Sequence, residues 1–218
     1  IEGKLPSDLV GQYLAMSCMP LNDGQHLFAG DGIMYNFSFD GSKAKMKSRH
    51  SKPISYYADR KLKGKETPFP FVTKQVARFN SEAGFRESVN TAFVAMDNQL
   101  LGTTDGGRPY LIDETDLKTL SPVGSYDEWL GLSAKGTQDE VLFPNILSSA
   151  HPAWDHEDKL LYTVHPSPAS MRDIFGSFTD IITWDGKGKL GKWKMLDEND
   201  QPISLEMSAH QVCVTDEY

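Results

Sequence analysis

The sequence predicts an all-β protein built from successive antiparallel hairpins. Short runs alternate apolar and polar residues with period two, and each run stops at a cluster of Asp, Asn or Gly. Helical periodicity is nearly absent. Repeated hairpins of this kind are typical of a β-sandwich, a β-barrel or a β-propeller. We find no clean internal sequence repeat that would separate these three architectures.

Four hairpins are predicted in chain order. Each combines two period-two runs with a short polar turn between them. Written as first strand, turn and second strand, they are 34–39, 40–41 and 43–49; 91–96, 97–98 and 99–104; 109–112, 113–116 and 119–123; and 181–184, 185–188 and 191–196.

The remaining segments are assigned by their turn and proline content. The acidic turn 155–158 precedes a further strand over 160–164, and a short helix is expected over 127–132. Residues 56–71, which contain two prolines, are predicted to form a long loop, and residues 166–171 a second loop.

Composition limits the classes of protein to which the chain can belong. With 218 residues, of which 39% are hydrophobic and 24% charged, it can bury a sizeable core. A net charge of −8 and scattered lysines argue against a nucleic-acid partner. No run approaches the 18 or so apolar residues of a spanning helix. Without a leader-like segment or an initiator Met, the chain is expected to begin inside a longer or processed protein. Cys18 and Cys213 lie in β-prone surroundings that predict buried thiols in a reducing compartment.

Two histidines stand at the edges of β-prone runs. His151 lies in the segment 147–155 and His210 in the segment 209–215. Imidazoles at the ends of different strands can converge on a transition metal. Neither segment is a local metal signature such as His-Glu-x-x-His, and a histidine beside proline is often only a turn residue. The spacing alone therefore leaves both interpretations open.

Several motifs resemble those of the carotenoid cleavage oxygenases. The His151 segment resembles their iron-ligand motif Ala-His-Pro-x-x-Asp, and the His210 segment resembles the motif His-x-Phe-x-Ile-Thr of a second ligand. Other segments resemble family motifs in the same order along the chain, namely 1–13, 26–34, 90–92, 100–101 and 106–113. The similarity thus extends over the whole sequence.

The resemblance implies a fold that the hairpins alone do not specify. Members are seven-bladed β-propellers with iron on the propeller axis and a loop or helix dome that forms a substrate tunnel. They are about twice as long as this chain, so residues 1–218 are expected to be the N-terminal half of a single propeller domain. Half a propeller leaves strand edges unpaired. We therefore expect a C-terminal half, from the same gene product or a second chain, as a partner.

The resemblance also implies a metal site. It assigns His151 and His210 as two of four histidine ligands of Fe(II), with two further histidines supplied by the C-terminal half. A ligand imidazole is usually oriented by a carboxylate that accepts its other ring N–H. The family uses Glu at the position of Asp105, so the shorter side chain would need a backbone shift or a bridging water, and a purely structural turn carboxylate is the alternative. Thr91 matches a threonine whose methyl group crowds an open iron position, and an ordinary strand threonine is the alternative there.

Other candidate residues receive no metal role. Tyr35 stands where relatives often have histidine, and the setting of His165 matches no ligand motif. His26, His50 and His156 are interpreted as turn or surface histidines.

The implied reaction is O2-dependent cleavage of a conjugated C=C bond in an apolar polyene, a carotenoid or apocarotenoid, to carbonyl products. Stilbene cleavers carry Lys where this chain has Thr104, and this difference argues against a stilbene substrate. A retinyl-ester isomerase on the same fold remains an alternative, and so does a non-catalytic propeller module if the C-terminal half is truly missing. We expect a cytoplasmic protein. Peripheral membrane contact is left open, because the substrate lives in lipid.

Overall fold

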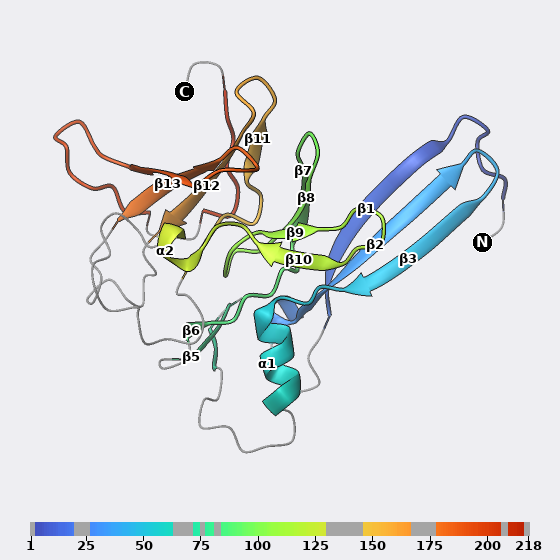
Figure 1. Ribbon diagram of the computed structural model, residues 1–218, viewed down its shortest axis with the longest axis horizontal. Helices are drawn as coiled ribbons and strands as arrows, with labels where there is room; N and C mark the ends of the chain where they lie inside the picture. The colour runs from blue at the N-terminus through green and yellow to red at the C-terminus, as the bar shows by residue number, and fades with distance from the viewer. Residues whose placement is uncertain are drawn as a thin grey trace.

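The structure is a computed structural model that describes residues 3–19, 27–62, 72–74, 77–80, 84–129, 146–166, 178–205 and 209–215. In these ranges the chain forms antiparallel sheets with little helix, which confirms the all-β prediction. Figure 1 shows three larger sheets that fan out from a common centre, with helix α1 (Ile54–Leu62) below them.

The first sheet contains three strands in chain order. They are β1 (Val10–Met19), β2 (Asp31–Asp40) and β3 (Ala44–His50), and the short helix η1 (Leu27–Ala29) precedes β2. The hairpin of β2 and β3 is the first one predicted from the sequence. Strand β1 was not predicted, although its register on β2 is regular over its full length.

The second and third sheets each contain four strands in chain order. The second consists of β7 (Ala92–Ala95), β8 (Leu100–Thr103), β9 (Tyr110–Ile112) and β10 (Thr119–Pro122). The third consists of β11 (Ala153–Asp155), β12 (Leu160–Pro166), β13 (Thr179–Trp184) and β14 (Gly191–Lys194). The other three predicted hairpins are therefore confirmed. A four-stranded meander of this kind is the repeating unit of a propeller blade.

A smaller sheet contains β4 (Val72–Lys74), β5 (Ala77–Asn80) and β6 (Gly84–Phe85). The long loop predicted over 56–71 is wrong in its first part, because α1 occupies residues 54–62. The prolines at 68 and 70 favoured a loop, but they lie beyond the helix, and residues 63–71 are outside the described ranges. Within α1, the guanidinium of Arg60 lies 4.5 Å from the ring centre of Tyr56, one turn away.

Helix α2 (Tyr126–Trp129) overlaps the short helix predicted over 127–132. Ser125 and Glu128 form a reciprocal cap: the amide of Ser125 donates to Glu128 Oε2 at 2.7 Å, and the amide of Glu128 lies 3.4 Å from Ser125 Oγ. Residues 130–132 are outside the described part of the chain, and so are residues 167–171 of the second predicted loop.

Aspartates begin several of the tight turns. The carboxylate of Asp185, for example, accepts the amides of Lys187 and Gly188 at 2.9 and 2.7 Å. The same pattern, an aspartate accepting the amides two and three residues later, occurs at Asp40, Asp113 and Asp155. These bonds favour the ionised carboxylate, and they lower the pKa of Asp40, Asp113 and Asp185. Each of these turns is therefore determined by residues that are close together in the sequence.

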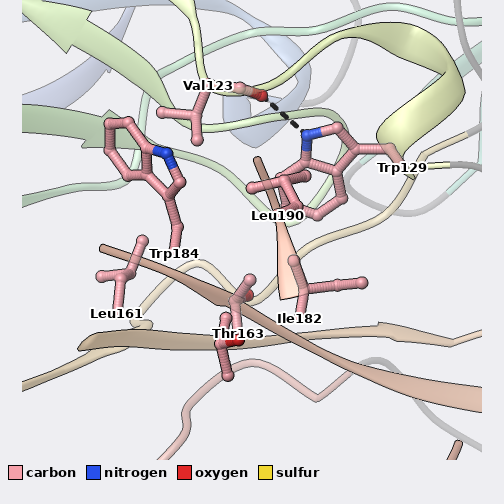
Figure 2. Close-up of a pocket in the computed structure, with 8 residues that line it drawn as sticks. Val123, Trp129, Leu161, Thr163, Ile182, Trp184 and Leu190 are labelled. Atoms are coloured by element: carbon pink, nitrogen blue, oxygen red, sulfur yellow. Dashed lines mark hydrogen bonds between the residues drawn. The ribbon is translucent and has the colours of Figure 1, made fainter. Parts of the chain in front are cut away.

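Two hydrophobic cores lie between the sheets. Strand β8 is buried on both faces, so Leu100 and Leu101, neighbours on a pleated strand, point into different cores. Leu100 packs with Met34 between the first and second sheets, whereas Leu101 packs with Ile182 between the second and third. Figure 2 shows part of this second core, where the indole N–H of Trp129 donates to the carbonyl of Val123 at 2.7 Å. The pocket drawn there has no room for a water molecule, so it is packed core.

The first strands of the three larger sheets face the same centre. Strand β7 contacts β1 on one side and β11 on the other. In a propeller the first strand of each blade is the one nearest the axis. Residues immediately before β7 and β11 therefore lie at the same end of the axis. No helix in the described ranges combines the length and apolar character needed to cross a membrane.

The cysteine prediction is wrong in part. Cys213 is exposed in this structure, and Cys18 is half-buried. Cys213 follows an isolated bridge instead of lying in a sheet, so the β-prone letters around it do not bury it. His50 also differs from the predicted turn or surface position, since it ends β3, is half-buried and has a buried Nδ1 atom.

Candidate metal centre

The candidate site lies at the axial end of the second and third sheets. Thr91 immediately precedes β7, Asp105 follows β8 by two residues, and His151 precedes β11 by two residues. Because β7 contacts β11, these three positions share one end of the fold. His210, far along the chain, is brought to them by an isolated parallel bridge between His151 and Gln211.

The two predicted histidine ligands lie side by side. The amide of His151 donates to the carbonyl of His210 at 3.0 Å, and the amide of Val212 donates to the carbonyl of His151 at 3.0 Å. The two ring centres are 4.8 Å apart and the ring planes are inclined by 76°. Two imidazoles at this separation can present nitrogen atoms to one ion.

Asp105 contacts His210 directly. Its Oδ2 lies 2.8 Å from His210 Nδ1, and its Oδ1 accepts the amide of Ala150 at 3.0 Å. The shorter side chain therefore reaches the ring without a bridging water. A carboxylate beside Nδ1 favours the tautomer with the proton on that atom, which leaves the lone pair of Nε2 available.

The donor set fits a metal that prefers imidazole ligands. The contact with Asp105 occupies one ring nitrogen of His210, and neither ring nitrogen of His151 makes a hydrogen bond within the described part of the chain. The side chain of His210 is 57% exposed and that of Asp105 is 19% exposed, so the pair lies at an accessible edge. No group of three or more His, Cys, Asp or Glu side chains among the described residues could hold a metal ion. A metal site built on these two histidines would need further ligands in addition to them.

Thr91 lies on the same hydrogen-bonding hub as Thr104. The hydroxyl of Thr91 donates to Asn90 Oδ1 at 3.1 Å, and the hydroxyl of Thr104 lies 3.4 Å from the same oxygen. The side-chain Nδ2 of Asn90 donates to the carbonyls of Phe28 and Gly30 at 2.8 and 2.9 Å. Asn90 therefore fixes the rotamer of Thr91 next to the inner end of β7, while Thr104 is buried with a neutral side chain.

The histidines without a predicted metal role lie elsewhere. His165 is buried on β12 with its Nδ1 3.0 Å from the carbonyl oxygen of Leu147, and burial lowers its pKa to about 4. His156 is exposed in the turn after β11, and His26 lies outside the described residues. Tyr35 is half-buried on β2, where its ring stacks on Phe37 at a centre distance of 6.3 Å.

Sequence reasoning missed the residues that hold the two ligand segments. Ser149, which is fully buried, donates through its hydroxyl to the carbonyl of His210 at 2.8 Å and through its amide to Thr163 Oγ1 at 3.0 Å. The hydroxyl of Thr103 donates to the carbonyl of Ala150. Ser and Thr between apolar residues are common in any β protein, so the sequence did not indicate that these residues hold the histidine segments.

The whole chain, residues 1–218, matches the family model described as retinal pigment epithelial membrane protein, RPE65. Among curated proteins it is 28% identical over 147 residues to a probable carotenoid cleavage dioxygenase 4, chloroplastic, of Arabidopsis thaliana, covering 58% of this chain and 24% of that protein.

Solved structures share the fold. A lignostilbene dioxygenase from Pseudomonas brassicacearum matches with a TM-score of 0.58 at 17% identity, over 88% of this chain and 37% of that one. An apocarotenoid oxygenase variant from Synechocystis matches with a TM-score of 0.57 at 19% identity, over 89% of this chain and 40% of that one. The chain thus spans less than half the length of these relatives, as a partial propeller. The family predicted from the motifs is confirmed: the chain belongs to the RPE65 and carotenoid cleavage oxygenase family.

Proposed function

We propose that this chain is the N-terminal half of a non-haem Fe(II)-dependent dioxygenase that cleaves a conjugated C=C bond of a carotenoid or apocarotenoid to carbonyl products. The observation that carries the proposal is the convergence of His151 and His210, with ring centres 4.8 Å apart, at the inner end of the sheets. Their family resemblance as iron ligands and their placement agree.

In this proposal the residues of this chain hold the metal ion and orient its ligands. In the proposal His151 and His210 supply two neutral ligands, and Asp105 keeps the proton of His210 on Nδ1 so that Nε2 faces the metal. Iron bound there would supply the activation of O2 that the cleavage requires. Thr91, held by Asn90, is proposed to narrow one approach to the ion with its methyl group.

The remaining blades are proposed to cover two apolar faces. On the outer face of the first sheet, Tyr13, Phe37 and Met46 form one cross-strand row, and Tyr13 and Met46 are 62% and 60% exposed. On the outer face of the third sheet, Ile181 pairs with Trp193, which is 63% exposed. Apolar faces at both ends of a stack of blades suit further blades packed on each side. The same remainder would supply the two missing histidines.

Iron retention by the full-length protein tests the metal assignment. We expect about one Fe per chain in the wild type, and loss of iron in His151→Ala and in His210→Ala, because a four-ligand neutral site loses much of its coordination energy with any one ligand. His156→Ala, which alters an exposed turn histidine, is the matched control and should keep its iron. Unchanged iron content in both ligand variants would refute the assignment.

Product analysis tests the reaction. Iron-loaded protein in air should release aldehydes from an apocarotenoid far faster than from a 4-hydroxystilbene, because the buried neutral Thr104 cannot compensate a phenolate charge. Faster release from the stilbene would overturn the substrate assignment. An O2-independent isomerised product would instead indicate the isomerase branch of the fold.

A further inference from the structure

The middle of the segment 146–151, which carries His151, is buried without being a strand. Ser148, Ser149 and Ala150 are 4%, 0% and 0% exposed, yet the segment makes only isolated bridges with its neighbours. Buried backbone groups outside a sheet need other partners, because an unpaired one is costly. In this segment side-chain hydroxyls and one carboxylate supply several of those partners.

Ser149 links this segment to the second histidine through its side chain. Its hydroxyl donates to the carbonyl of His210 at 2.8 Å, and the same carbonyl accepts the amide of His151 at 3.0 Å. The two histidine segments are otherwise joined by the short parallel bridge and by Asp105, which contacts both. The Ser149 hydroxyl is therefore a separate tie between them.

Thr163 anchors Ser149 to the third sheet. Its Oγ1 accepts the buried amide of Ser149 at 3.0 Å, and Thr163 is itself 2% exposed on β12. Figure 2 shows Thr163 beside Leu161 and Ile182, in the packed core between the second and third sheets. This core thus connects through Thr163 and Ser149 to the carbonyl of His210.

We propose that Ser149, held in place by Thr163, is a positioning residue that sets the separation of the His151 and His210 rings. The inference rests on the proposed function for its metal-binding consequence, but the positioning is a property of the polypeptide alone. Ligands that already hold their binding geometry bind a metal more tightly, because less binding free energy is spent on ordering the side chains.

Metal titration of the iron-free, full-length protein tests the consequence. Ser149→Ala removes only the hydroxyl, and Thr163→Val keeps the shape of the side chain but leaves the Ser149 amide without its acceptor. Each should weaken Fe(II) binding roughly 10-fold and shift the absorption bands of bound Co(II), as outer partners of metal ligands do. Thr163→Ser, which keeps the hydroxyl, should bind Fe(II) as tightly as the wild type. Thr183→Val, a buried threonine lining the same pocket, is the control and should bind as the wild type.

Amide hydrogen exchange in the metal-free protein tests the positioning itself. Ser149→Ala should speed exchange at the amides of His151 and Val212 by about 3- to 10-fold, the effect of losing one net hydrogen bond. Exchange at these amides that equals the wild type would overturn the inference, whatever the metal result. A wild type that binds no metal would refute the proposed function, while the exchange result would still decide the role of Ser149. Unchanged metal affinity in Ser149→Ala, in a protein that loses metal on His151→Ala, would also overturn the inference and leave the proposed function standing.

Discussion

Replacement of Asp105 by Asn separates hydrogen-bond polarity from shape at the candidate site. Asp105 accepts on both oxygens: Oδ2 is 2.8 Å from His210 Nδ1, and Oδ1 accepts the Ala150 amide at 3.0 Å. Asparagine has one acceptor and one donor in the same outline. If its oxygen stays on the Ala150 amide, its NH2 group faces Nδ1 and favours the imidazole with the proton on Nε2. That tautomer has no lone pair for a metal on Nε2.

The other orientation of the asparagine is no better. Turning the amide so that its oxygen meets His210 places the NH2 group against the amide of Ala150, donor against donor, in a buried segment. An unsatisfied buried donor costs about 1–3 kcal/mol. Because the side chain of His210 is 57% exposed, the charge of Asp105 is partly screened, and control of the tautomer is the larger effect.

We therefore expect Asp105→Asn to fold and to bind Fe(II) roughly 10- to 100-fold more weakly than the wild type, which is about 1.4–2.7 kcal/mol. Metal titration measures the loss, and nitrogen NMR of the His210 ring in the metal-free protein should show the proton moved to Nε2. Asp105→Glu should retain iron, and Asp185→Asn, which changes an exposed turn carboxylate, is the control. Full iron occupancy and turnover in Asp105→Asn would return Asp105 to the role of a turn residue.

Three further outcomes are expected. Leu101→Ala, which opens a fully buried site between the second and third sheets, should lower the free energy of unfolding by about 2–5 kcal/mol in denaturant titration, against at most about 0.5 kcal/mol for the exposed Leu120→Ala; equal effects would contradict the packing. Burial lowers the pKa of His165 from 6.5 to about 4, so between these pH values the unfolded chain binds a proton on this residue and the folded chain does not. The free energy of unfolding should therefore fall by up to about 3 kcal/mol as pH drops from 6.5 to 4. His165→Asn can keep the contact with Leu147 but cannot titrate, so a pH dependence as steep as that of the wild type would reject this account. Thr104→Lys should raise the ratio of stilbene to apocarotenoid turnover if a counter-charge at this buried position selects the substrate, and an unchanged ratio measured by product analysis would remove Thr104 from the account.

The hairpins could be predicted because their determinants are local. Alternation along β2 and an aspartate that accepts the amides of the next turn act within a few residues. The capping pair of Ser125 and Glu128 is equally local. Helix α1 was missed because prolines further along dominated the interpretation of residues 56–71. The family motifs identified candidate residues, since a motif carries the outcome of tertiary contacts without showing them.

By itself the sequence determined the all-β class, four of the hairpins and the identity of His151, His210, Asp105 and Thr91 as candidates. Only the tertiary structure decided how they meet. The contact between Asp105 and His210 joins residues 105 positions apart, and it exists because three sheets pack with their first strands toward one centre. The tie from Thr163 through Ser149 to His210 likewise depends on a non-strand segment being buried between two sheets, where its backbone groups must find side-chain partners. Such partners are chosen by packing across the fold, and no local pattern of residues encodes them.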